Sequence, residues 1–129
     1  MKHKPIITKI HLVISVIIVI PAAVIYGFEP QSLLDMLNKT IDEHNFSKAV
    51  MGIYLSFSIL WLTGLFKSQY LKYAIITNIF FMLGLGIGRV ISINVDGFPT
   101  TPFLLGTLGE LILGFYGVWL INSKYIEMS

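Results

Sequence analysis

Four long apolar runs, separated by short polar segments, dominate the pattern of this chain. They cover about residues 10–28, 46–66, 70–93 and 101–121. Each run is close to the ~20 residues that a helix needs to cross the hydrocarbon core of a bilayer. The pattern predicts an all-α fold, an integral membrane four-helix bundle. Because the four spans use most of the 129 residues, a single four-span membrane domain is expected, without a soluble domain.

Composition supports the same class. The chain is 55% hydrophobic and 12% charged, whereas soluble domains carry about 25% charged residues. Such a sequence cannot cover a water-facing globule. The absence of cysteine excludes disulfides and thiolate metal sites. No basic patch with interleaved aromatic residues indicates nucleic acid as a partner, and no motif predicts a cofactor.

The lysines predict the orientation of the spans. The apolar part of the first span is longer than the roughly 7–15 residues of a signal-peptide core, so this span is expected to be retained. Six lysines fall on the side of the chain termini and two on the other side: Lys2, Lys4, Lys9, Lys67, Lys72 and Lys124 against Lys39 and Lys48. The positive-inside rule therefore places both termini in the cytoplasm.

The first outer loop, residues 29–45, carries its own helical signal. Ser32 and Asp35 resemble a capping box after Pro30, which predicts a short helix. Four apolar residues then share one face: Leu33, Leu34, Leu37 and Ile41. The segment is expected to lie flat at the membrane surface, either as a lid over the bundle or as a plain connector.

Arg89 and Glu110 lie inside the third and fourth spans. A charge at such depth costs roughly 2.5–3.5 kcal/mol on insertion scales, so it needs a partner or a purpose. Their opposite charges on neighbouring helices predict a buried ion pair. Asn78 precedes Arg89 by three turns and projects from nearly the same face, so the three residues are predicted to form one polar column.

Glycines support an inward-facing Glu110. Gly106, Gly114 and Gly117 lie four or seven residues from Glu110 on the same helix face. Small residues at this spacing let helix backbones approach closely in lipid. Glu110 is therefore expected on a packing face and not on a lipid-facing one.

Three further polar residues complete the predicted ligand-binding set. Asp96 is followed by Gly97, which indicates a tight turn, and its carboxylate is also a candidate partner for Arg89. Tyr54 and Ser56 in the second span lie at a depth where they can line the same cavity. Alternatively, such groups bond to backbone carbonyls of their own helix. His11 and Trp61 are expected at the membrane interface.

A family resemblance rests on several short motifs. These are Gly27-Phe28-Glu29-Pro30, Asn45-x-x-Lys48-Ala49-x-x-Gly52, and Gly88-Arg89-x-x-Ser92-x-x-x-Asp96-Gly97-x-Pro99 with Glu110 downstream. The arrangement resembles a family of small bacterial four-helix membrane proteins known only as a domain of unknown function. It is loosely similar to DoxX-like membrane proteins. The resemblance implies a four-helix fold in the bacterial inner membrane and a polar cluster near the outer face, but no activity.

Three functions remain open, besides a purely structural ion pair that fixes helix packing. The first is binding of a lipid, quinone or similar amphiphile in the outer half of the bundle. The second is an accessory subunit packed against a larger membrane partner. The third is a small oligomeric transporter that uses Glu110. An enzyme is least supported, because no nucleophile–base pair or metal-ligand cluster can be assembled.

Overall fold

Four long helices make up the described part of the chain. The computed structural model describes residues 5–28 and 40–123. The helices are α1 (Pro5–Phe28), α3 (Ile41–Phe66), α4 (Leu71–Asp96) and α5 (Thr101–Ile121), with a short 3-10 turn, η1 (Ser68–Tyr70), before α4. Each is long and apolar enough to cross a membrane. The predicted all-α, four-helix membrane fold is therefore confirmed, and the chain is a multi-pass membrane protein.

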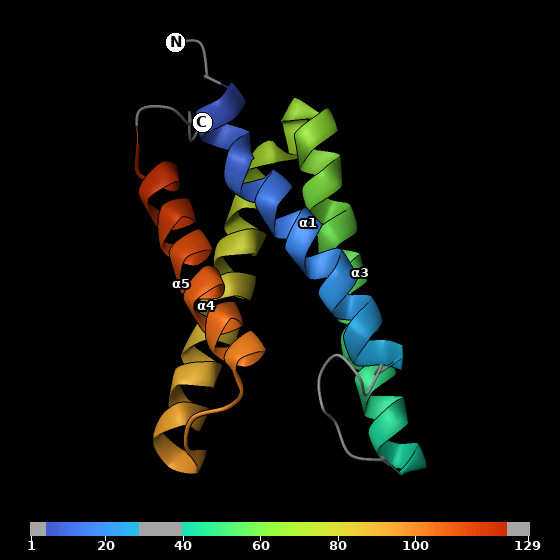
Figure 1. Ribbon diagram of the computed structural model, residues 1–129. Coiled ribbons are helices and arrows are strands. Elements are labelled where there is room, and N and C mark those ends of the chain that lie inside the picture. Colours follow the sequence, from blue (N-terminus) through green and yellow to red (C-terminus); the bar gives the residue numbers. More distant parts are fainter. Residues whose placement is uncertain (1–4, 29–39, 124–129) are drawn as a thin grey trace.

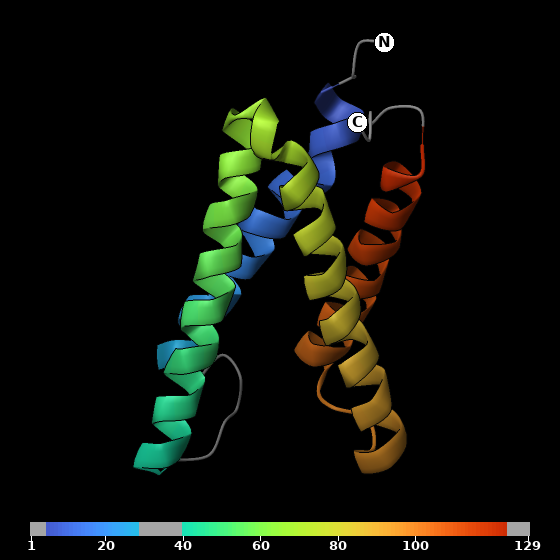
Figure 2. The same cartoon turned by 180° about the vertical axis from the view of Figure 1, so that it is seen from behind.

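The helices form two antiparallel pairs. The most extensive contacts join α1 with α3 and α4 with α5, and the two pairs meet chiefly along α3 and α4. The pairs lie closest where α1 starts and α5 ends, and they diverge toward the other end (Figures 1 and 2). We call the first the terminal end, at Pro5, Lys67 and Ile121, and the second the open end, at Phe28, Thr40 and Gly97.

Helix α3 begins earlier than hydropathy predicts. The Thr40 hydroxyl accepts a hydrogen bond from the backbone N–H of Glu43 at 3.2 Å, which caps the helix at Ile41. Asp42 and Glu43 in the first turn suit the positive end of the helix dipole. Ile41 therefore belongs to α3, contrary to the prediction that it continues the loop helix. The rest of that loop helix, and its proposed role as a lid, lies outside the described residues.

The turn between α4 and α5 follows the predicted signal. Helix α4 continues to Asp96, and Gly97 follows it with a φ of 102°. Glycine adopts this left-handed region without the steric cost that other residues meet. The predicted turn at Asp96-Gly97 is therefore present. Pro102 stands in the first turn of α5, where its missing N–H costs nothing.

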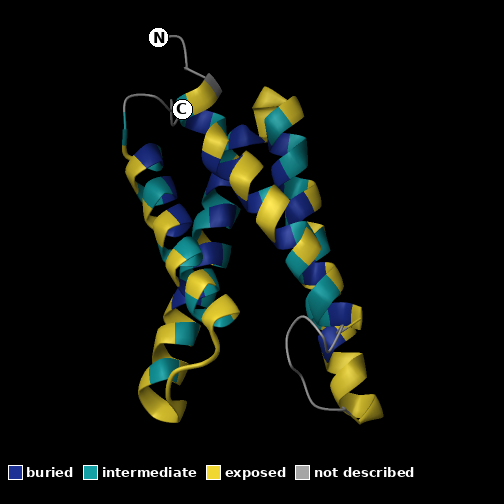
Figure 3. Cartoon of the chain, in the orientation of Figure 1, coloured by how far each residue is buried: buried dark blue, intermediate teal, exposed yellow. Residues whose placement is uncertain are grey.

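Burial is concentrated between the helices, while large apolar side chains cover the outward faces (Figure 3). Such exposure is expected when lipid is the solvent. Gly114 and Gly117 let α5 approach α4 closely, since an added Cβ would lie 2.5 Å from Leu83 and 2.7 Å from Ile79. The predicted packing face of α5 is therefore confirmed at these two glycines.

Trp61 packs in the protein core, whereas the sequence indicated only an expected position at the membrane interface and no contacts. It is fully buried, its ring centroid lies 5.0 Å from that of Phe81, and its indole N–H donates to the hydroxyl of Thr77. The neighbouring Thr77 supplies the polar contact that an interfacial tryptophan normally takes from water.

Candidate binding site at the open end

Arg89 and Glu110 form the predicted ion pair. The Nε of Arg89 donates to Oε1 of Glu110 at 2.7 Å, and 22% and 13% of the two side chains are exposed. A charge-assisted hydrogen bond of this length is among the stronger ones in proteins. The pair joins α4 to α5 across their contact face.

Tyr26 extends this pair to the other helix pair. Nη2 of Arg89 donates to the Tyr26 hydroxyl oxygen at 3.1 Å, and Tyr26 lies near the end of α1. We call these three residues, Tyr26, Arg89 and Glu110, the polar bridge. It connects α1, α4 and α5, and therefore links the two helix pairs where they diverge. The Phe103 ring lies beside it, with its centroid 5.9 Å from Cζ of Arg89.

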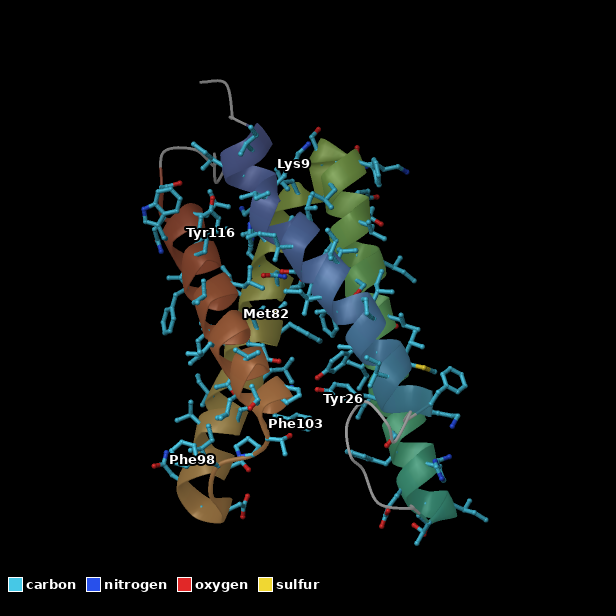
Figure 4. All side chains as sticks on the ribbon, in the orientation of Figure 1. Lys9, Tyr26, Met82, Phe98, Phe103 and Tyr116 are labelled. Carbon is cyan, nitrogen blue, oxygen red and sulfur yellow. The ribbon has the colours of Figure 1, made fainter. Side chains whose placement is uncertain are left out.

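A cavity of about 350 Å³ lies between α1, α4 and α5 and reaches the polar bridge. We call it the deep cavity, because Val19, Met82 and Leu113 line its far end. Tyr26 and Phe103 lie on the two sides of the space between the helix pairs, with Met82 further from the open end (Figure 4). The polar residues lining the deep cavity are the three of the bridge and Tyr54, so its polarity is confined to one end.

A second cavity, of about 450 Å³, lies between α3 and α4 on the other side of the polar bridge. We call it the mouth cavity. Ser47 from α3 and Ser92 from α4 line it, together with Phe46, Val50 and Gly88. Tyr26, Leu85, Arg89 and Phe103 line both cavities. Both cavities therefore border the polar bridge, and Arg89 lines each of them.

The predicted polar column does not extend to Asn78. Its side chain is fully buried, and neither amide atom has a hydrogen-bond partner among the described residues. Asn78 also lines neither the deep cavity nor the mouth cavity. The structure thus brings Arg89 and Glu110 together but leaves Asn78 three turns away, at a fully buried position.

His11 is also more buried than predicted. It is only 2% exposed, and its ring centroid lies 5.2 Å from that of Tyr116. Neither ring nitrogen has a hydrogen-bond partner within residues 5–28 and 40–123. Because α1 starts at Pro5, His11 lies within the helix and packs against Tyr116 of α5, a contact that the interfacial interpretation did not include.

The other candidates divide between the cavity and the surface. Tyr54 is buried, lines the deep cavity, and packs edge-on against Tyr26 with centroids 5.6 Å apart. The exposed Ser56 donates to the carbonyl of Gly52 at 2.8 Å, as the alternative of backbone bonding anticipated. Asp96 accepts from the Ser92 hydroxyl at 2.9 Å, so its recorded partner is Ser92 and not Arg89.

Sequence reasoning missed the roles of Tyr26 and Phe103. Both lie near span ends, where aromatic residues usually meet the lipid headgroups. The signal that could have identified Tyr26 is its depth, since in a four-span topology Tyr26 near the end of α1 and Arg89 near the end of α4 lie toward the same side of the membrane. No comparable signal distinguishes Phe103 from its apolar neighbours.

Comparison with known proteins assigns the chain to a family. The family model described as "Domain of unknown function (DUF4345)" matches residues 7–121. The chain belongs to the DUF4345 family. No curated protein and no solved structure matches it. The DUF4345 match covers α3, α4 and α5 completely, and α1 from residue 7 onward. Every residue of the polar bridge therefore lies within the family domain.

The geometry of this DUF4345 chain suits binding more directly than catalysis. Arg89 holds a third guanidinium nitrogen, Nη1, and Tyr26 a hydroxyl proton beyond the bonds of the bridge. Both residues line the deep cavity and the mouth cavity, at the point where apolar lining gives way to polar groups. Among the described residues, no group of three or more His, Asp or Glu lies close enough to hold a metal ion.

Proposed function

We propose that this protein binds a lipid-like amphiphile in the deep cavity, with the polar head of the ligand at the polar bridge. The observation that carries the proposal is the distribution of polarity in the cavity. Apolar residues from α1, α4 and α5 line its length, while Arg89, Glu110 and Tyr26 meet at one end. A volume of about 350 Å³ lies within the roughly 300–1,000 Å³ of small-molecule sites.

The lysine distribution supports a position of this site toward the outer side of the membrane. With six lysines on the side of the termini, the positive-inside rule puts that side in the cytoplasm. We therefore propose a bacterial inner-membrane protein whose open end, with the polar bridge, faces outward. An amphiphile in the outer leaflet would then reach the cavity laterally or from the membrane surface. The DoxX-like similarity adds an architectural analogy and no activity.

Native mass spectrometry of protein extracted gently from its membrane tests the proposal. We expect wild-type protein to retain a defined amphiphile that Arg89→Ala loses. Gly106→Leu should also lose it, because Gly106 lines the deep cavity and an added Cβ meets no atom within 4 Å. The matched control is Gly84→Leu, an exposed position outside both cavities with equal room. Retention of the same mass in Arg89→Ala and Gly106→Leu would overturn the proposal.

An accessory subunit is the second candidate. Gly52 and Gly84 are exposed, and neither would place an added Cβ near another atom. Small residues on exposed faces permit close contact with helices of another protein in lipid. Crosslinking in native membranes distinguishes this candidate, since Gly84→Leu should then remove the crosslinked partner and leave bound amphiphile unchanged. A transporter is less supported, because Glu110 is bonded to Arg89.

A further inference from the structure

We infer that the ligand is electrically neutral, with an oxygen-bearing head in the mouth cavity and its apolar chain in the deep cavity. This inference rests on the proposed function and names the class of amphiphile. It excludes free fatty acids and other single-charge amphiphiles as the preferred ligands. The shared chemistry of the remaining class is an uncharged head with hydroxyl, ester or quinone oxygens.

Charge balance at the polar bridge carries the first step. Arg89 brings one positive charge to the cavities, and Glu110 neutralises it through a contact of 2.7 Å. Two other charged residues that lie toward the open end among the described residues are Lys48, which donates to the carbonyl of Gly27, and Asp96, which accepts from Ser92. Neither of these residues lines either cavity.

A charged head would therefore gain little at this site. It would have to leave water or the lipid headgroup layer, and an ion that loses its solvation needs a compensating charge. The positive charge of Arg89 already compensates the negative charge of Glu110. A neutral head makes no such demand and can still accept hydrogen bonds from Arg89 and Tyr26.

The lining of the mouth cavity indicates where this head lies. Ser92 contributes a hydroxyl oxygen that accepts hydrogen bonds even while its proton is directed to Asp96. Ser47 adds a second hydroxyl group from α3. Together with Arg89 and Tyr26, these groups suit a head that both donates and accepts hydrogen bonds.

The lining that the two cavities share completes the argument. Tyr26, Leu85, Arg89 and Phe103 line both spaces, so a ligand that occupies both passes directly beside the bridge. The mouth cavity holds the serines, and the deep cavity holds the long apolar wall. An amphiphile with its head in the mouth cavity and its chain in the deep cavity matches this gradient.

A comparison of three probes with the same chain tests the charge preference. Purified full-length protein is titrated with monooleoylglycerol, oleate and oleylamine, and bound mass is followed by native mass spectrometry. We expect monooleoylglycerol to bind at least about tenfold more tightly than either charged probe. Glu110→Gln leaves the charge of Arg89 uncompensated, so in this variant oleate should become the tightest ligand. Tightest binding of oleate or oleylamine by wild-type protein would overturn the inference.

Leucine substitutions at two glycines test the roles of the two cavities separately. Gly88 lines the mouth cavity and Gly106 the deep cavity, and an added Cβ has open space at each. We expect Gly88→Leu to remove the preference for monooleoylglycerol over oleyl alcohol, and Gly106→Leu to weaken both. Gly84→Leu should change neither. Equal preference in Gly88→Leu and wild type would contradict a head in the mouth cavity.

The outcomes separate this inference from the proposed function. Binding of no probe, or binding that Gly106→Leu leaves unchanged, contradicts the proposed function itself. Binding with a charged probe preferred contradicts only the inference. A neutral quinone with a decyl chain provides a further arm. We expect it to displace monooleoylglycerol from wild-type protein more effectively than oleate does, and displacement that is more effective with oleate would overturn the inference.

Discussion

Arg89 joins two neighbours by two different nitrogens, Nε to Glu110 and Nη2 to Tyr26. Removing one member of a buried ion pair typically costs about 3–5 kcal/mol, because the other charge stays buried without its partner. We expect Arg89→Met and Glu110→Met each to lower the melting temperature in detergent clearly. The double variant should recover most of the loss. Tryptophan fluorescence during thermal unfolding measures all four proteins.

This double-mutant cycle also distinguishes a structural role of the ion pair from a role in ligand binding. If the losses of the single variants simply add, the two side chains are not energetically coupled, and the ion pair does not stabilise the bundle. If the double variant is stable and has lost the bound amphiphile, the pair acts in binding beyond its role in packing.

Asn78 differs from the ion pair, because its buried side chain has no hydrogen-bond partner among the described residues. Leaving a buried polar group unpaired costs about 1–3 kcal/mol. Valine is apolar and close to asparagine in size and helix propensity. We therefore expect Asn78→Val to keep or raise the melting temperature and to leave bound amphiphile unchanged.

A matched control for Asn78 is Ser58→Ala. Ser58 is also fully buried, but its hydroxyl donates to the carbonyl of Tyr54 at 2.8 Å. A lower melting temperature in Asn78→Val than in Ser58→Ala would show that Asn78 has a partner, such as a bound water. Loss of the amphiphile in Asn78→Val would restore Asn78 to the binding site that the sequence predicted.

At the scale of residues, the ion pair was predictable because charged side chains are rare within membrane spans. Arg89 and Glu110 are unusual inside apolar runs, so their pairing could be predicted from the sequence alone. Asn78 is equally unusual, but a shared helix face does not fix its neighbours on other helices. Tyr26 was missed because an aromatic residue near a span end has an ordinary explanation at the interface.

At the scale of elements, hydropathy located the four long helices of the described residues, but it did not locate all of their ends. It responds to the hydrocarbon core and not to polar capping residues, so it missed the start of α3 at Ile41 after Thr40. It also ended the third span before Asp96, whereas hydrogen bonding continues the helix to that residue. The fourth span was predicted at residues 101–121, matching α5, because Pro102 marks its first turn.

The packing faces of the helices were predictable only where glycine marks them. Gly114 and Gly117 contact α4 as their spacing indicates. Gly106 shares their face but lines the deep cavity instead, because α1 and α4 have diverged at that level. Since lipid is as apolar as the core, hydrophobic pattern does not separate buried from exposed faces. Trp61 illustrates this, as a fully buried residue predicted at the interface.

At the scale of the whole molecule, the divergence of the two helix pairs decides where the cavities lie. Because the connection between α4 and α5 is short, the sequence predicts that these two helices pack as antiparallel neighbours. No sequence pattern, however, predicts the angle between one pair and the other. That angle depends on side-chain packing at the terminal end, where Leu12, Ala74 and Leu120 are fully buried. The positions of the deep and mouth cavities therefore could not be predicted from the sequence, although the ion pair between Arg89 and Glu110 could.

The Tyr26–Arg89 hydrogen bond is a polar contact that links the two pairs at the open end. Tyr26→Phe removes this bond and keeps the aromatic packing against Tyr54, so the pairs should separate further or sample a wider range of distances. The chain has no cysteine, and spin labels can therefore be placed cleanly at Phe28→Cys and Val95→Cys, both exposed positions near the open end. We expect Tyr26→Phe to lengthen or broaden the distance distribution between these labels.

Labels at the terminal end provide the control for this measurement. Ile6→Cys and Trp119→Cys are exposed positions on α1 and α5, where apolar packing and the Tyr116 hydroxyl, bonded to the carbonyl of Ile7 at 2.6 Å, hold the helices together. Their distance should not respond to Tyr26→Phe. A selective change at the open end would identify the polar bridge as the restraint that sets the width of the cavities. An unchanged distribution there would show that helix packing alone sets the divergence, and that the bridge only borders a space formed without it.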